Sequence, residues 1–114
     1  MKKDIPIIAA LQDQLDEICH ARQVNRLYLF GSALTEAFDQ SKDSDLDFLV
    51  SMDAQLLPLE RGEHLLQLWT ELELLFGRPV DLLTDTSLQN PFLKREIDAT
   101  KALVYDGASQ KILV

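Results

Sequence analysis

Residues 44–50 of this 114-residue chain read SDLDFLV, and this stretch decides the fold. Its apolar run, residues 46–50, is typical of a buried strand, yet Asp47 interrupts it and Asp45 directly precedes it. Because side chains alternate across a strand, both acids point to one face, about 7 Å apart. An acid among strand hydrophobics costs free energy unless something compensates it. The stretch therefore predicts a strand that carries an acidic pair with a role beyond packing.

Two further apolar stretches carry polar residues at comparable places. Residues 26–30 read RLYLF and predict a second buried strand, which Gly31 ends and Ser32 follows. Residues 79–83 read PVDLL and predict a third strand with Asp81 inside it. If this third strand pairs with the strand that carries Asp45 and Asp47, Asp81 completes a cluster of three acids. Bare carboxylates would repel one another, and a hard divalent cation such as Mg²⁺, as one ion or a pair, removes that conflict.

Gly31 and Ser32 form a candidate phosphate-binding turn at the exit of a strand. Glycine permits a positive φ and lets the backbone approach a phosphate closely. Serine adds a hydroxyl, and a helix that starts after it offers free N–H groups. A Gly-Ser pair alone is equally a plain turn, so its meaning comes from its place after a buried strand and before the acids.

Helices and strands alternate along the chain, which is the pattern of an α/β or α+β protein. No repeat or interdomain linker interrupts this pattern, so we expect one domain over residues 1–114. Pro58 and Gly77 mark the start and the end of a long helix, and Asn90 caps the last one. Besides the three strands, the expected elements are helices over about 5–22, 32–38, 56–76 and 91–100, a turn over 39–44, and a fourth strand over 102–105.

Composition excludes several classes of function. The chain has 11 basic and 19 acidic residues, a net charge of −8, which argues against binding a nucleic-acid backbone. A single cysteine, Cys19, makes neither a disulfide nor a zinc cluster, and no apolar run is long enough to span a membrane. We therefore expect a cytoplasmic protein that neither enters a membrane nor binds nucleic acid directly.

The three polar motifs together resemble a known family. Residues 30–32 (FGS), 44–50 (SDLDFLV) and 80–82 (VDL), in this order, resemble the nucleotidyltransferase superfamily typified by DNA polymerase β. Within that superfamily, the chain is most similar to the minimal nucleotidyltransferase (MNT) group, whose members are near this length. The resemblance implies the polymerase β-like palm, a mixed sheet of about four strands packed with helices.

The resemblance also implies roles for five residues. Gly31 and Ser32 would bind the phosphates of the nucleotide. Asp45 and Asp47 would be catalytic residues that bind Mg²⁺, with two ions expected. Asp81 would be the third acid of the site, either a metal ligand or the base for the attacking hydroxyl.

The MNT group further implies a partner and a reaction. Its members often pair with a helical HEPN protein, an RNase toxin, and some transfer AMP from ATP to a tyrosine hydroxyl of that partner. The chain would then be a magnesium-dependent nucleotidyltransferase that acts as an antitoxin. A palm without a second domain leaves the nucleotide open to water, so we expect a homo- or hetero-oligomer. The candidate contacts are the 56–76 helix and the first helix.

One loop departs from the family pattern. Many members read Gly-Ser-x-Ala-Arg-Gly after the first strand, whereas residues 31–36 here read GSALTE, and Glu36 adds a negative charge near the expected triphosphate. Arg26, Lys42 or the Lys94–Arg95 pair are candidates for the missing positive charge. Two other readings therefore stay open: a binding module that neutralises its partner by contact, and nucleotidyl transfer to a small molecule.

Overall fold

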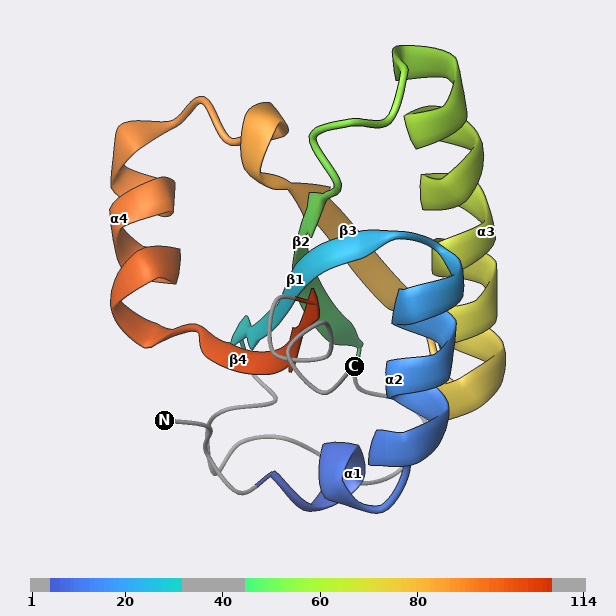
Figure 1. Cartoon of the computed structure of the whole chain (residues 1–114). Helices are drawn as coiled ribbons and strands as arrows, with labels where there is room; N and C mark the ends of the chain where they lie inside the picture. Colours follow the sequence, from blue (N-terminus) through green and yellow to red (C-terminus); the bar gives the residue numbers. More distant parts are fainter. Residues whose placement is uncertain (1–4, 32–44, 108–114) are drawn as a thin grey trace.

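The computed structural model describes residues 5–31 and 45–107, so the helix expected over 32–38 and the turn expected over 39–44 lie outside the described residues (Figure 1). Four strands form one sheet in the order β3-β2-β1-β4. In chain order the elements are α1 (Pro6–Ala9), α2 (Gln12–Ala21), β1 (Val24–Phe30), β2 (Leu46–Met52), α3 (Pro58–Phe76), β3 (Val80–Thr84), the 3-10 helix η2 (Asp85–Ser87), α4 (Pro91–Thr100) and β4 (Ala102–Asp106).

The sheet is mixed. β1 pairs antiparallel with both β2 and β4, whereas β2 and β3 run parallel. A parallel pair needs a crossover connection, and α3 provides it. Figure 1 shows α2 and α3 on one side of the sheet and α4 on the other. This arrangement, a mixed four-stranded sheet packed with helices, confirms the expected fold class.

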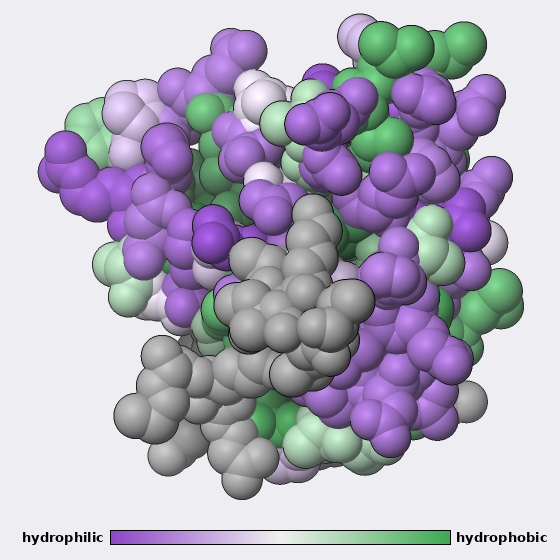
Figure 2. All heavy atoms as spheres, viewed as in Figure 1, coloured by the Kyte–Doolittle hydropathy of each residue, from purple (hydrophilic) through white to green (hydrophobic). Residues whose placement is uncertain are grey.

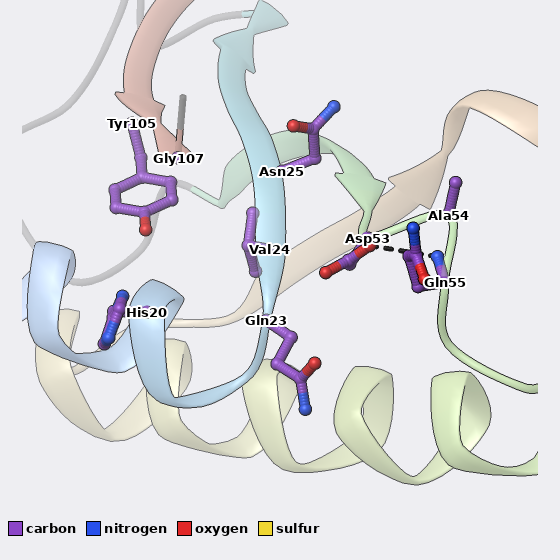
Figure 3. Close-up of a pocket in the computed structure, with 9 residues that line it drawn as sticks. All are labelled: His20, Gln23, Val24, Asn25, Asp53, Ala54, Gln55, Tyr105 and Gly107. Atoms are coloured by element: carbon purple, nitrogen blue, oxygen red, sulfur yellow. Dashed lines mark hydrogen bonds between the residues drawn. The ribbon is translucent and has the colours of Figure 1, made fainter. Parts of the chain in front are cut away.

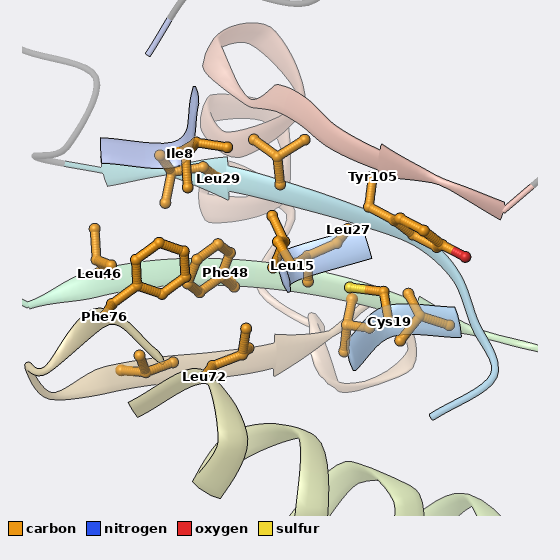
Figure 4. Packing of buried hydrophobic residues seen from close by; sticks show 14 of the residues in the cluster. Ile8, Leu15, Cys19, Leu27, Leu29, Leu46, Phe48, Leu72, Phe76 and Tyr105 are labelled. Carbon is orange, nitrogen blue, oxygen red and sulfur yellow. The ribbon is translucent and has the colours of Figure 1, made fainter. Parts of the chain in front are cut away.

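The main hydrophobic core lies between the sheet and the helices α1, α2 and α3. Every second residue of the central strands points into it, as the pleat of a strand requires. Phe48 of β2 packs near Phe76 of α3, with ring centroids 6.0 Å apart (Figure 4). The fully buried strand residues on this face are Leu27, Leu29, Leu46, Phe48 and Val50.

The single helix expected over about 5–22 is wrong, because the chain breaks into α1 and α2. Leu11 at the break has φ −125° and ψ 22°, outside the helical region. The apolar spacing continues through the break, so periodicity alone does not reveal it. The side chain of Gln12 donates a hydrogen bond to the carbonyl oxygen of Val104 at 2.9 Å, which fixes the start of α2 against β4.

The other helix ends follow their predicted signals. The long helix begins at Pro58, two residues later than the expected 56, and ends at Gly77, whose φ of +65° is the left-handed conformation that glycine adopts readily. The Asn90 side chain accepts hydrogen bonds from the backbone N–H groups of Phe92 and Leu93 at 2.9 and 3.3 Å. α4 is therefore capped as the sequence predicts.

All four expected strands are present, and each end lies within two residues of its expected place. β1 starts earlier than expected, at Val24, and β2 continues to Met52. Over residues 5–31 and 45–107, no helix has both the length and the apolar character that crossing a membrane requires.

Candidate active site

Asp47 and Asp81 lie side by side near the start of β2 and β3. The parallel register pairs Leu46 with Val80 and Asp47 with Asp81. Leu46 and Val80 belong to the core beneath the helices, so the two acids point to the other face of the sheet. Neighbouring strands are about 4.8 Å apart, which places the two carboxylates within reach of one cation. The strand pairing on which the predicted acidic cluster depends is thus present.

Gly31 lies against Asp47. Phe30, the last residue of β1, pairs with Asp47, and the next residue, Gly31, has a φ of +78° that other residues rarely adopt. A Cβ atom on residue 31 would also overlap the Asp47 carboxylate. Both the backbone conformation and the close contact therefore require glycine at this turn. The remaining predicted loop residues, Ser32, Glu36 and Lys42, lie outside the described residues.

Burial and two neighbouring acids raise the pKa of Asp47 above its ordinary value. Partial burial is the largest cause, followed by the charge of Asp81 and then by that of Asp45. Asp45 is exposed and comes one residue before β2. Because like charges disfavour the ionised form, Asp47 senses both other acids, and a cation among them would remove the penalty.

The acidic cluster fits a hard cation that also binds a substrate. Its three side chains offer carboxylate oxygens, the ligands that Mg²⁺ prefers in proteins. Within the described part of the chain, no three acidic, histidine or cysteine side chains are placed to hold an ion by themselves. Mg²⁺ usually completes its shell with water and substrate phosphates, so an open set of protein ligands is compatible with it. The register brings Asp47 and Asp81 together as the residues that would hold it, whereas Asp45, exposed and one residue before β2, is not placed with them as a third ligand.

Two of the candidate cations, Arg26 and Lys94, already form ion pairs with other acids. Arg26 is four residues before Phe30, about 13 Å along β1, and forms an ion pair with Asp106 at 3.6 Å. The Lys94–Arg95 pair is exposed on α4, where the Lys94 ammonium lies 3.4 Å from the Asp98 carboxylate. Arg26 in particular is at the wrong end of its strand to offset a charge at the acidic cluster.

Lys101 is a cation at the same end of the sheet as the acids, and the sequence analysis missed it. It directly precedes Ala102, which pairs with Leu29, so it lies near the end of β1. Its ammonium is 4.3 Å from the centre of the Tyr28 ring and 2.9 Å from Asp98. The signal that would have found it is the antiparallel register of the 26–30 and 102–105 strands, which places residue 101 beside Phe30.

A separate cavity of about 450 Å³ lies at the other end of β2. Figure 3 shows Asp53 at this cavity, where its carboxylate accepts a hydrogen bond from the backbone N–H of Gln55 at 2.9 Å. Asp53 is six residues beyond Asp47, so about 20 Å of chain separates the cavity from the acidic cluster. The cavity is therefore not part of the candidate active site.

Comparison with protein families agrees with this geometry. The model of the family described as polymerase beta, nucleotidyltransferase, matches residues 13–110. The match spans α2 to β4 and includes all three acids. The chain therefore belongs to the polymerase β nucleotidyltransferase family, and its class is that of a nucleotidyltransferase.

Individual relatives place the chain near the minimal members of this family. A protein of Methanocaldococcus jannaschii named "putative protein adenylyltransferase" is 34% identical over 76 residues, which cover 67% of this chain and 72% of that protein. A solved structure named "putative minimal nucleotidyltransferase" is 25% identical, with a TM-score of 0.61, and the match covers 87% of this chain and 94% of that one. The complex of a tri-AMPylated Shewanella oneidensis HEPN toxin with an MNT antitoxin shares the fold at 18% identity, with a TM-score of 0.54 and coverage of 92% and 77%. The predicted resemblance to the MNT group is thus confirmed.

Proposed function

We propose that this chain transfers AMP from ATP to a tyrosine hydroxyl of a partner protein, with Mg²⁺, and so acts as the cytoplasmic antitoxin of a HEPN toxin. The observation that carries the proposal is the in-register pair of Asp47 and Asp81 against the Gly31 turn. Two relatives support the finer points. One is named a protein adenylyltransferase, and the other is an MNT antitoxin bound to an AMPylated HEPN toxin.

The turn after β1 binds the triphosphate in this proposal. Gly31 has no Cβ, so phosphate oxygens can approach its backbone closely, and Ser32 adds a hydroxyl donor. Lys101 adds positive charge on the β1–β4 side of the acids. Its ammonium is already held between the Tyr28 ring and Asp98, so little side-chain entropy is lost when it meets a phosphate.

The acids supply the metal site and the proton acceptor. Bound Mg²⁺ would offset the charges of the triphosphate and of the carboxylates. Asp45 and Asp47 would hold it, while Asp81 would either be a further ligand or accept the proton of the attacking hydroxyl. The hydroxyl oxygen bonds to the α-phosphorus as the bond from that phosphorus to the pyrophosphate oxygen breaks. Rate enhancement then comes mainly from positioning and electrostatics.

The strand order gives the site a direction. Asp81 lies on β3 at one edge of the sheet, Asp47 on β2, and Lys101 next to β4 at the other edge. An in-line displacement puts the attacking and leaving oxygens on opposite sides of the phosphorus. The acceptor hydroxyl therefore enters from the β3 side in this proposal, and pyrophosphate leaves toward the β1–β4 side.

Labelled ATP tests the transfer reaction. The chain is incubated with Mg²⁺, ATP labelled at the α-phosphorus, and a HEPN-type partner protein. We expect label on a tyrosine of the partner, and we expect none with the Asp45→Ala plus Asp47→Ala double variant. An unlabelled partner, across several nucleotides and divalent metals, would overturn the proposal.

A contact-only antitoxin is the second candidate. The observation that favours it is the loop of residues 31–36, which lacks the arginine and the second glycine of the family pattern. The same double variant distinguishes the two functions. If the folded variant neutralises its partner as well as the wild type does, contact suffices and transfer is not required.

A further inference from the structure

An apolar groove of about 530 Å³ runs along α3 beside the edge strand β3. We name it the α3–β3 groove, and the residues that matter here are Leu59, Gly62, Glu63, Leu66, Trp69 and Leu82. Leu59 is 76% exposed, Leu66 66% and Trp69 42%. Figure 2 shows apolar residues at the surface over the start of α3. Apolar surface gathered in one groove is typical of an interaction site.

The outer edge of β3 is closed to an added strand. Val80 donates its N–H to the Glu73 carboxylate at 3.0 Å, and its carbonyl accepts from the Trp69 indole at 2.7 Å. At the other end, the Ser87 hydroxyl accepts from the Thr84 N–H and donates to the Thr84 carbonyl. Side chains of the protein itself thus occupy both ends of the edge. An occupant of the groove must bind through side chains, as a helix does.

Gly62 points to a close-packed occupant. It lies in the interior of α3, lines the groove, and would have nothing within 4 Å of an added Cβ. Glycine weakens a helix interior relative to alanine, so the isolated chain gains nothing from it. A partner helix explains this glycine, because the missing side chain lets a second backbone approach α3.

Charge selects the kind of occupant. Glu63 lines the groove, and the chain carries a net charge of −8. A second copy of the chain would bring the same negative charge against this face. Of the four glutamates of α3, Glu60, Glu71 and Glu73 contact groups of the chain itself, so Glu63 is the acid that the groove presents to an occupant. An occupant with basic residues beside its apolar stripe therefore fits this surface better than a second copy.

We propose that the α3–β3 groove binds an amphipathic, basic-flanked helix of the acceptor protein and so brings that protein to the acidic cluster; this inference rests on the proposed function. Leu82 lines the groove, and Asp81 precedes it in β3, on the opposite face. The groove and Asp81 therefore share the edge strand but lie on opposite faces of the sheet, so a partner docked in the groove reaches Asp81 around the outer edge of β3. This is the side from which the acceptor hydroxyl enters.

Three variants of α3 test the groove by their affinity for the same HEPN-type partner protein. Leu66→Ser should weaken binding by about tenfold or more, since buried apolar anchors dominate interface affinity. Leu74→Ser is the matched control, because Leu74 is 78% exposed on the same helix but lies outside the groove residues. It should change affinity by less than about twofold. Titration calorimetry at low and high salt measures both, and higher salt should weaken wild-type binding.

Gly62→Ala supplies a test that a folding defect cannot imitate. Alanine should raise the melting temperature of the isolated chain, because it is the better helix former. It should also weaken partner binding, because its methyl group occupies the space of the partner helix. The affinity for Mg²⁺–ATP should be unchanged in all three variants, since the three residues belong to α3, which packs on the face of the sheet opposite to Asp47.

The outcomes separate this inference from the proposed function. Wild-type affinity in both Leu66→Ser and Gly62→Ala overturns the docking proposal, even if label is transferred. Groove-dependent binding by a wild-type chain that transfers no label overturns the transfer reaction and supports the groove. A homodimer that Leu66→Ser dissociates makes a second copy the occupant, which also overturns the proposal.

Discussion

The two faces of β2 have different roles, although the residues that form them alternate along the strand. Leu46, Phe48 and Val50 are fully buried against α1, α2 and α3, whereas the other face carries the buried Leu49 together with Asp47 and Ser51, which keep contact with solvent. Burial of each large apolar side chain contributes about 1.5–3 kcal/mol. The other face instead gathers acids, and partial burial together with the charges of Asp81 and Asp45 raises the pKa of Asp47. One strand thus stabilises the fold and carries the site, and a register slip of one residue would exchange the two roles.

Phe48→Ala removes a core residue from the face of β2 that packs against the helices α1, α2 and α3. It should have the largest effect of the variants considered, a loss of stability. Phe48 is fully buried and packs near Phe76, so its truncation leaves a cavity in the core. We expect a loss of about 3–5 kcal/mol of unfolding free energy. Urea unfolding followed by circular dichroism measures it, with the exposed Leu74→Ala as control. A loss below about 1 kcal/mol would show that this face is not the stabilising one.

Asp47→Asn should abolish the function of the acidic face of β2 without unfolding the chain. The amide keeps the shape of the side chain but loses the charge that the metal site needs. We expect transfer of label from ATP to fall by about 10²–10³-fold, the cost of removing one electrostatic element of a transition state. Circular dichroism should match the wild type. Retained transfer at normal rate would remove Asp47 from the catalytic machinery.

Gly31→Ala should lower both the stability of the fold and the affinity for nucleotide, because Gly31 forms the turn beside Asp47. Its φ of +78° and the overlap of an added Cβ with the Asp47 carboxylate both oppose alanine. The backbone conformation alone costs about 1–2 kcal/mol. The melting temperature and the affinity for Mg²⁺–ATP should therefore both fall, measured by calorimetry. Gly77→Ala has the same positive φ with no close contact, so it should lower the melting temperature and leave nucleotide affinity unchanged.

Lys101→Gln tests whether Lys101, which directly follows α4, has a role in ATP binding that Lys94 of α4 lacks. If Lys101 assists the triphosphate, the KM for ATP should rise by about tenfold with a smaller change in kcat, and Lys101→Arg should restore most of the loss. Lys94→Gln is the control, because Lys94 contacts the same Asp98 on the exposed side of α4. Equal effects of the two glutamine variants would indicate that Lys101 acts only on the helix.

The smallest expected effect is on the pH dependence of stability. The folded state raises the pKa of Asp47, so the folded chain holds this proton more tightly than the unfolded chain does. Its contribution to stability is greatest below the ordinary Asp range and is lost as pH rises through the raised value. Asp47→Asn should therefore gain melting temperature relative to the wild type at pH 7 and lose that gain in acid. An equal difference at both pH values would contradict the charge coupling.

The strands and the acids could be predicted because their signals are local. A run such as LDFLV identifies a strand, and an acid such as Asp47 within it is conspicuous at once. Capping residues work in the same way, since Asn90 and Gly77 determine the backbone within one turn. Placement of Asp81 beside Asp47 was a conditional prediction, and the parallel pairing of β2 with β3 met the condition.

The features that escaped prediction depend on contacts distant in the sequence. Leu11 fits the helical spacing on both sides, so the spacing does not predict the break. The break is explained by the hydrogen bond from the Gln12 side chain to the carbonyl oxygen of Val104, which is distant in the sequence. Lys101 resembles any solvated lysine until the β1–β4 register places it near Phe30. Arg26 resembles a site cation until the same register pairs it with Asp106. The register of the β1–β4 pair thus determines the positions of Lys101 and Arg26, whereas the helix break depends on a side-chain contact.

The closed outer edge of β3 has a consequence for the chain before any partner arrives. A parallel edge strand with free amides is a template on which further copies can stack into fibrils. Here the side chains of Trp69, Glu73 and Ser87 already satisfy the amide and carbonyl groups of Val80 and Thr84. The apolar groove beside that edge can thus remain open to water without seeding stacked strands at those two residues.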